Sequence, residues 1–176
     1  MTAPMPMIER RRIEATILKH VYETLKASHG IEAAKLAVAE AVRRASIEQG
    51  RELAAVVGGQ TSLKTFADLQ AQWTAAGALE VTVKEQSDAV YAFDVTRCRY
   101  AELYREMGLG EIGHLLSCQR DGTFCEGYDP RMKLTRTQTI MQGAGHCDFH
   151  YRLEPPDRSA PRPAEPDQTR VRPPST

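Results

Sequence analysis

The chain has 176 residues, 41% of them apolar, and its 23 basic and 23 acidic side chains give a formal net charge of zero. This length suits one domain with its own core, and a neutral chain has no broad field to attract nucleic acid or anionic lipid. We therefore expect no nucleic-acid partner and no membrane partner. The N-terminal sequence has no apolar h-region, which predicts a cytoplasmic, reducing setting. There the 4 cysteines are expected to be free thiols, metal ligands or a nucleophile rather than disulfides.

The first predicted element is an amphipathic helix over about residues 8–28, which Gly30 ends. Its apolar residues recur at four-residue steps and form a stripe: Ile13, Ile17, Val21 and Leu25. The length of the N-terminal helices and their apolar stripes predict that the chain forms a homodimer through them.

Two further helices are predicted before residue 78. An Ala-rich helix covers about residues 31–57, and Gly50 inside it lowers its intrinsic helix stability. A third helix begins at Ser62, a suitable N-cap, and runs towards Gly77. The first half of the domain is therefore predicted to be entirely helical.

The hydrophobic pattern then changes to a period of two, which indicates strands. One half-buried strand begins at about Leu79, and a second covers about residues 89–96. The second strand presents apolar residues on one face: Tyr91, Phe93 and Val95. Its other face is small and polar, and either meets water or lines a pocket: Ala92, Asp94, Thr96 and, by continuation, Cys98.

Two helices and two more strands complete the pattern. The helices are predicted over about residues 100–107 and 111–126, and the strands over 132–141 and 146–153, joined by the turn sequence QGAG. The predicted fold class is α+β, with N-terminal helices packed on a roughly four-stranded antiparallel sheet. The sheet is built of two hairpins with two intervening helices.

These elements give one predicted domain over residues 8–153, helical over 8–77 and a sheet with inserted helices over 78–153. A flexible N-terminus of residues 1–7 precedes it. Residues 154–176 hold 7 of the 10 prolines and almost no large apolar side chain, which predicts a disordered tail.

Candidate chemical groups cluster on the predicted helix from Glu111. His114, Cys118, Asp121 and Cys125 are spaced i, i+4, i+7 and i+11, which places them on one helix face. Cys125 is interpreted as a core residue, because cysteine is among the most buried residue types. A carboxylate such as that of Asp121, on a face shared with thiols and leucines, must be paired or functional.

The last two predicted strands add a second cluster. Cys147 falls on the apolar face of the last strand, whereas His146 and Asp148 fall on its polar face. Arg136 in the partner strand has two interpretations. It either forms an internal ion pair with Asp148 or Asp121, or captures the carboxylate of a substrate with two parallel hydrogen bonds.

Two kinds of chemical centre fit these residues. One is a thiolate nucleophile, Cys118 or Cys147, with Asp121 or a histidine as its base. The other is a divalent metal, zinc or manganese, held by ligands such as Cys118, Asp121 and Cys147. The sequence leaves the cofactor open between a metal and none.

Three runs carry a resemblance to a known family: FDVTRCRYAELYREMG, LLSCQRDGTFCEGYDP and LTRTQTIMQGAGHCDFHY. They resemble the L-2-amino-thiazoline-4-carboxylic acid hydrolase family, and the resemblance covers about residues 8–153. The family pattern is a Cys after the second strand, a Cys-x-x-Asp helix and a Gly-x-x-x-Cys-Asp-Phe hairpin. The matching positions here are Cys98, Cys118, Asp121, Gly143, Cys147, Asp148 and Phe149.

The resemblance implies a hydrolase with a small-molecule substrate. Water would add to C2 of a thiazoline ring, the C–S bond would break, and N-carbamoyl-L-cysteine would result. This needs a base or thiolate, an acid, and a cation for the substrate carboxylate. We assign Asp121 as base, Cys118 as nucleophile or metal ligand, and Arg136 as carboxylate clamp, with His146 and Asp148 as proton donor or orienting group.

The predicted site therefore has a catalytic set and a binding set. The catalytic set is Cys118, Asp121, Cys147, Asp148 and His146, and the substrate-binding set is Arg136, Cys98, Asp94 and Thr137. A contrasting hypothesis is a non-enzymatic domain that senses or carries a small molecule or a metal. A third is a structural homodimer whose cysteines fill the core.

Overall fold

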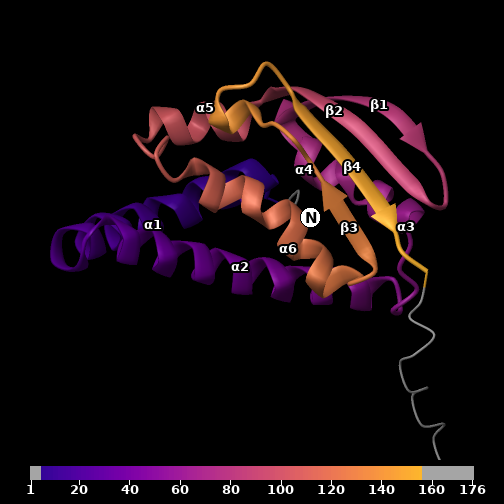
Figure 1. The fold of residues 1–176 in the computed structure, drawn as a ribbon, viewed down its shortest axis with the longest axis horizontal. Coiled ribbons are helices and arrows are strands. Elements are labelled where there is room, and N and C mark those ends of the chain that lie inside the picture. Colours follow the sequence, from indigo (N-terminus) through magenta and orange to yellow (C-terminus); the bar gives the residue numbers. More distant parts are fainter. Residues whose placement is uncertain (1–4, 156–176) are drawn as a thin grey trace, which may run out of the picture.

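The computed structural model describes residues 5–155. The prediction of a flexible N-terminus and a disordered tail falls largely on residues 1–4 and 156–176, outside this range. Long helices form one layer and an antiparallel sheet forms the other, with α6 lying between α2 and the sheet (Figure 1). This arrangement confirms the α+β class. No helix within residues 5–155 combines the length and apolar character needed to cross a bilayer.

The N-terminal helices α1 (Met7–His29) and α2 (Ile31–Val56) form an antiparallel pair. Gly30 makes the tight connection with φ of 87°, a left-handed value that favours glycine. The side of α1 that faces the rest of the chain carries a buried arginine among apolar residues: Ile8, Arg11, Ala15 and Tyr22.

The predicted apolar stripe of α1 is largely exposed. Ile13, Ile17 and Val21 are 56%, 65% and 42% exposed, whereas Leu25 packs at the edge of the core. The core side of α1 is formed instead by Ala15 and Tyr22, so α1 packs on its neighbours through residues outside this stripe. Homodimerisation through these helices stays a prediction, which light scattering can measure.

Helix α2 continues unbroken through Gly50, where it crosses α6 (Gln119–Tyr128). A Cβ atom at Gly50 would overlap the carbonyl oxygen of Phe124, and one at Gly127 would overlap that of Ile47. The glycine that seemed to weaken α2 instead lets two helix backbones come into direct contact.

The predicted third helix is divided into α3 (Leu63–Asp68), α4 (Gln70–Thr74) and a 3₁₀ turn over Ala75–Gly77. Ser62 does cap α3, since its hydroxyl accepts a 3.1 Å hydrogen bond from the backbone N–H of Thr65. The capped segment buries aromatic and aliphatic side chains under the sheet.

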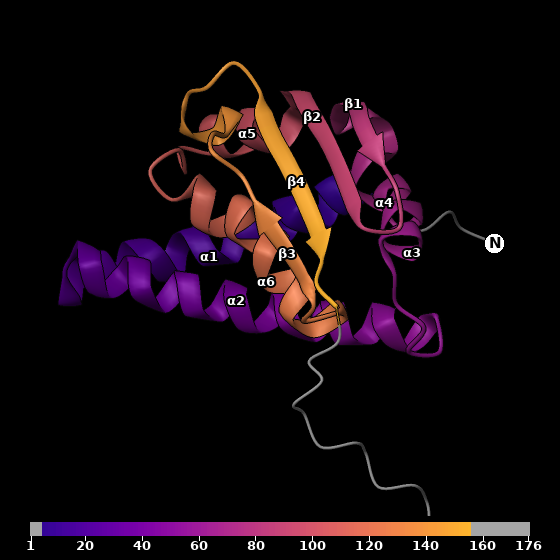
Figure 2. The ribbon, with the colours of Figure 1, turned by 45° about the vertical axis from the view of Figure 1, so that its right-hand side comes forward.

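The sheet contains β1 (Leu79–Gln86), β2 (Val90–Cys98), β3 (Met132–Thr135) and β4 (Cys147–Leu153) in the order β1-β2-β4-β3 (Figure 2). Every neighbouring pair is antiparallel. The inner faces of β2 and β4 carry the aromatic core: Tyr91, Phe93, Phe149 and Tyr151.

The third strand is shorter than predicted, and QGAG does not form a tight hairpin. Strand β3 ends at Thr135, and a 3₁₀ turn over Ile140–Gln142 follows. The backbone N–H groups of Thr137 and Gln138 donate to the carboxylate of Asp148 on β4 instead of to a strand. The carboxylate of Asp148 on β4 therefore takes the place of the last backbone hydrogen bonds predicted for the third strand.

The helices between the hairpins are α5 (Arg99–Glu106) and a second segment that begins as a π-helical turn, His114–Cys118, before α6. A π turn inserts extra backbone into a helix and rotates the residues on either side relative to one another. This rotation alters the single helix face predicted for His114, Cys118, Asp121 and Cys125. The turn ends at Cys118, one of the predicted catalytic residues.

Candidate functional site

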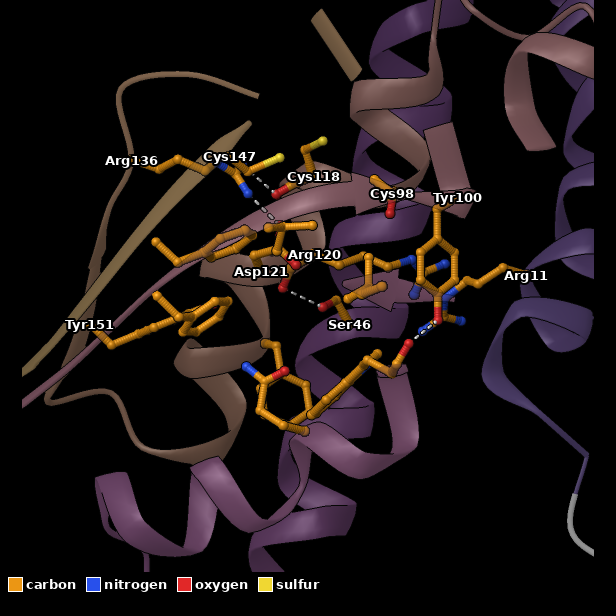
Figure 3. Close-up of a pocket in the computed structure, with 18 of the residues that line it drawn as sticks. Arg11, Ser46, Cys98, Tyr100, Cys118, Arg120, Asp121, Arg136, Cys147 and Tyr151 are labelled. Carbon is orange, nitrogen blue, oxygen red and sulfur yellow. Dashed lines mark hydrogen bonds and ion pairs between the residues drawn. The ribbon is translucent and has the colours of Figure 1, made fainter. Parts of the chain in front are cut away.

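A cavity of about 100 Å³ lies between the inner face of the sheet and helices α1, α2 and α6 (Figure 3). It is smaller than the pockets that hold drug-sized ligands, so it suits a small compound. One wall is aromatic, formed by Phe66, Trp73, Phe93, Phe124, Phe149 and Tyr151. The polar side chains of the other walls include residues from both predicted clusters.

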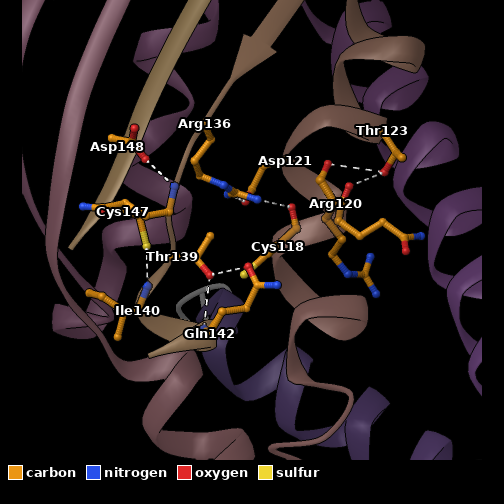
Figure 4. A network of polar contacts seen from close by, with 12 residues as sticks. Cys118, Arg120, Asp121, Thr123, Arg136, Thr139, Ile140, Gln142, Cys147 and Asp148 are labelled. Atoms are coloured by element: carbon orange, nitrogen blue, oxygen red, sulfur yellow. Dashed lines mark hydrogen bonds and ion pairs between the residues drawn. The ribbon is translucent and has the colours of Figure 1, made fainter. Parts of the chain in front are cut away.

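Asp121 and Arg136 form an ion pair on the wall of this cavity (Figure 4). Arg136 Nη1 lies 2.5 Å from Asp121 Oδ2, and Arg136 Nη2 donates a 3.0 Å hydrogen bond to the carbonyl oxygen of Cys118. The guanidinium also lies over the ring of Phe149, 4.9 Å from its centroid. Of the two interpretations of Arg136, the structure shows the internal ion pair with Asp121.

Burial raises the pKa of Asp121 above its ordinary value, and the adjacent Arg136 opposes this rise. The Asp121 side chain keeps 31% of its surface accessible, and it lines the cavity. Within residues 5–155, its only side-chain hydrogen-bond donor is Arg136, on Oδ2. Oδ1 is therefore available to exchange a proton with a molecule in the cavity.

Three thiols line the same cavity: Cys98, Cys118 and Cys147. Burial raises the pKa of Cys98 to about 11 and that of Cys118 to about 12, and Asp121 adds to the rise for Cys118. Burial also raises the pKa of Cys147, whose Sγ accepts a 3.2 Å hydrogen bond from the Ile140 N–H. At neutral pH these side chains are therefore thiols rather than thiolates.

Cys98 reaches the cavity because strand β2 contains a bulge. Val81 pairs with Val95 and Glu80 pairs with Arg97, so Thr96 is an extra residue on β2. Strict alternation from Val95 would send Cys98 to the outer face. The extra residue reverses the alternation, and Cys98 faces inward.

The π-helical turn divides the predicted helix face. Cys118 and Asp121 line the cavity, whereas His114 does not. Cys125 is buried in the aromatic cluster, where its Sγ lies 3.4 Å from the Asp121 carbonyl oxygen, in agreement with its interpretation as a core residue.

Four predicted site residues lie outside the cavity, so the structure does not group them with Cys118 and Asp121: Asp94, Thr137, His146 and Asp148. Asp148 accepts hydrogen bonds from the Thr137 hydroxyl at 2.6 Å and from the Gln138 N–H at 2.9 Å. Partial burial opposes these bonds, but together they lower its pKa. Asp94 pairs with Lys84 at 2.8 Å, and His146 contacts the Gln138 amide. Asp94 and Asp148 face outward because side chains alternate along β2 and β4, whereas Thr137 and His146 lie in the connection between β3 and β4, outside both strands.

The cavity also contains polar residues that the sequence pattern did not single out: Arg11, Ser46, Gln49, Gln70 and Arg120. One signal was present. Arg11 lies three residues after Ile8 and four before Ala15, so it falls on the buried side of α1. An arginine in the middle of an apolar helix face is a candidate functional residue.

Residues 5–155 do not offer a suitable metal site. In the described part of the chain, no three His, Cys, Asp or Glu side chains are arranged to hold a metal ion. Of the candidate ligands Cys118, Asp121 and Cys147, the carboxylate of Asp121 is already bound by Arg136 and the Cys147 Sγ already accepts a hydrogen bond from the Ile140 N–H. These residues do not fit a divalent metal, and no metal-dependent step follows from them.

A family model described as L-2-amino-thiazoline-4-carboxylic acid hydrolase matches residues 10–151. The chain belongs to this family. The match runs from within α1 to within β4 and includes all the cavity residues. It confirms the resemblance drawn from the three sequence runs.

Two solved structures resemble the fold of this family member. The phenol-responsive sensory domain of the transcription activator PoxR, determined with phenol, has a TM-score of 0.49 and 16% identity, covering 79% of this chain and 73% of that one. A trafficking protein particle complex subunit 3 from Naegleria fowleri, covalently bound to palmitic acid, has a TM-score of 0.48 and 13% identity, covering 83% and 96%. No curated protein matches the chain in sequence.

Proposed function

We propose that this protein is a hydrolase that opens the ring of a small cyclic amidine or isothiourea, of the 2-amino-thiazoline-4-carboxylate type. The observation that carries the proposal is Asp121, a carboxylate with a raised pKa and a free oxygen on the wall of a cavity of about 100 Å³. Membership of the hydrolase family supports the same reaction class.

The reaction needs one water and no redox partner. Asp121 Oδ1 accepts a proton from water as its oxygen attacks C2 of the ring, between nitrogen and sulfur. The C–S bond then breaks and C2 becomes a carbonyl carbon. One proton from water ends on the ring nitrogen and the other on the departing sulfur, which leaves a carbamoylated amine and a thiol.

Arg136 serves as the positioning residue in this scheme. Its two hydrogen bonds fix the Asp121 carboxylate against the backbone of Cys118, so the free oxygen keeps one orientation. The aromatic wall supplies an apolar surface for the ring of the substrate. Water is the proposed nucleophile because the raised pKa of Cys118 leaves little thiolate at neutral pH.

A panel of small cyclic amidines, lactams and hydantoin-like rings, assayed for release of a new thiol or amine, tests this function. We expect turnover of a cyclic isothiourea that carries a carboxylate, and its loss in Asp121→Asn. Binding of ring compounds without turnover of any of them would contradict the hydrolase proposal and assign a small-molecule carrier or sensor instead.

A further inference from the structure

Two arginines from different helices meet at the end of the cavity away from the sheet. Arg11 on α1 is 4% exposed, and the Arg120 side chain on α6 is 12% exposed. Figure 3 shows the Arg120 side chain extending towards Arg11 and Tyr100. Both arginines line the cavity, and neither belongs to the Asp121–Arg136 pair at its other end.

These buried cations share a single carboxylate. Glu14 Oε2 lies 2.6 Å from Arg11 Nη1 and 3.1 Å from Arg120 Nη2. Because Arg136 already pairs with Asp121, three guanidinium groups face two carboxylates, and one positive charge is left over. A buried charge without a counterion is strongly unfavourable, so this end of the cavity favours an anion.

The hydrogen-bonding capacity of the two arginines is also incompletely used. Arg11 Nη2 donates to Gln49 Oε1 at 2.9 Å, and Arg120 Nε donates to the Leu116 carbonyl oxygen at 2.9 Å. Within residues 5–155, Arg120 Nη1 has no hydrogen-bond acceptor. Burial and the nearby Arg11 lower the pKa of Arg120 to about 10, which leaves it protonated at neutral pH.

We propose that Arg11 and Arg120 bind the carboxylate of a small heterocyclic ligand whose ring lies in the cavity. The assignment of the ring rests on the proposed function, whereas the preference for an anion comes from the charge of the cavity itself. A carboxylate held at this end leaves the ring against the aromatic wall and directs its other side towards Asp121. Arg136, which the sequence suggested as the carboxylate clamp, then only orients Asp121.

The test is calorimetric binding of two unreactive compounds, thiazolidine-4-carboxylate and its neutral carboxamide. Neither has an amidine carbon, so turnover does not interfere. The variants are Arg120→Met and the charge-keeping Arg120→Lys, with Arg10→Met as the matched control. Arg10 contacts the same Glu14 at 3.0 Å, but its side chain is 53% exposed and it does not line the cavity.

We expect Arg120→Met to weaken carboxylate binding by about 10- to 100-fold while carboxamide binding changes little. Arg120→Lys should retain part of the preference, and Arg10→Met should retain all of it. Glu14→Gln provides a test of opposite sign, because removing the internal counterion should tighten carboxylate binding. A destabilised variant would not produce that gain.

The proposal is overturned if the wild-type protein binds neither compound at millimolar concentration, or binds both equally well. Carboxylate affinity that is unchanged in Arg120→Met and unimproved in Glu14→Gln would also overturn it. The hydrolase proposal fails separately, since the wild-type protein would then keep this binding preference while turning over no ring compound of the panel.

Discussion

Neighbouring residues of strand β4 lie on opposite faces of the sheet, in two different environments. Cys147 faces inward and lines the cavity, whereas Asp148 faces outward and is fixed by donors from the chain after β3. The same contrast holds for two carboxylates. Burial raises the pKa of Asp121, which has one side-chain hydrogen-bond donor. Despite the partial burial of Asp148, several hydrogen-bond donors lower its pKa. One carboxylate is the proton acceptor of the proposed mechanism, and the other is an anion that organises a loop.

This comparison shows why closeness in sequence is a poor guide to a shared role. Asp148 follows Cys147 directly, yet a side chain one position along a strand lies on the opposite face of the sheet. Asp121 is far from Cys147 in sequence, but both line one cavity. The site is therefore defined by the inner face, and the outer face supports it by shaping the loop over residues 136–146.

The largest expected effect is on kcat, which should fall far more for a change at Asp121 than for a change at Asp148. Asp121→Asn should lower kcat by a factor on the order of 10²–10⁴, because the base is lost while the size of the side chain is kept. Asp148→Asn should change kcat by less than about tenfold. Steady-state kinetics on a ring compound from the panel measures both, and equal losses in the two variants would remove the distinction between the faces.

The pH dependence of kcat/KM gives a second test of Asp121 as the base. Asp121 must be unprotonated to accept a proton from water, and its pKa is raised. The acidic limb of kcat/KM should therefore lie at higher pH than that of an ordinary aspartate. A limb at the usual aspartate pKa would contradict this role.

The next effect is on stability and concerns the crossing of α2 and α6, the helices behind the inner face of the sheet. Gly127→Ala should destabilise the protein by about 1–3 kcal/mol or more, because the new methyl group overlaps the backbone of α2 at Ile47. Gly122→Ala on the same helix is the control, since no atom lies within 4 Å of its added Cβ. Gly122→Ala should be neutral or stabilising by about 0.5–1 kcal/mol. Urea denaturation measures both, and equal midpoints would contradict the close crossing of α2 and α6.

Much of this architecture could be predicted from the hydrophobic period and from capping residues. The inward alternation of Tyr91, Phe93 and Val95 was correct, as was the helix cap at Ser62. Both depend only on residues within a few positions of one another, which a sequence displays directly.

The failures come from backbone irregularities and long-range contacts. The bulge at Thr96 brings Cys98 inward, and the π turn His114–Cys118 interrupts the regular helical spacing from which His114 and Asp121 were placed on one face. The hydrogen bonds to Asp148 end β3 early. None of these has a local sequence signature, because each is decided by a partner strand, helix or loop distant in the chain.

A smaller effect on stability should appear at the outer face. Asp148→Asn should lower the free energy of unfolding by about 1–3 kcal/mol at neutral pH, because the Thr137 and Gln138 N–H groups lose a charged acceptor. The pKa of Asp148 is lowered on folding, so its contribution is present above the ordinary aspartate pKa and lost as pH falls through the lowered value. Denaturation at neutral and acidic pH should show the two proteins converging on acidification, and a constant difference would contradict this linkage.

The smallest expected effect is on the thiols of the inner face. Cys118→Ala should reduce kcat by less than about tenfold, because a thiol with a pKa of about 12 contributes little thiolate at pH 7. Loss of a covalent nucleophile would instead lower kcat by a factor on the order of 10³ or more. Cys125→Ala is the matched control, since its thiol is buried on α6 outside the cavity, and its effect should fall on stability. A loss of the larger size in Cys118→Ala alone would mean that substrate binding generates the thiolate, and the attacking group would then be sulfur rather than water.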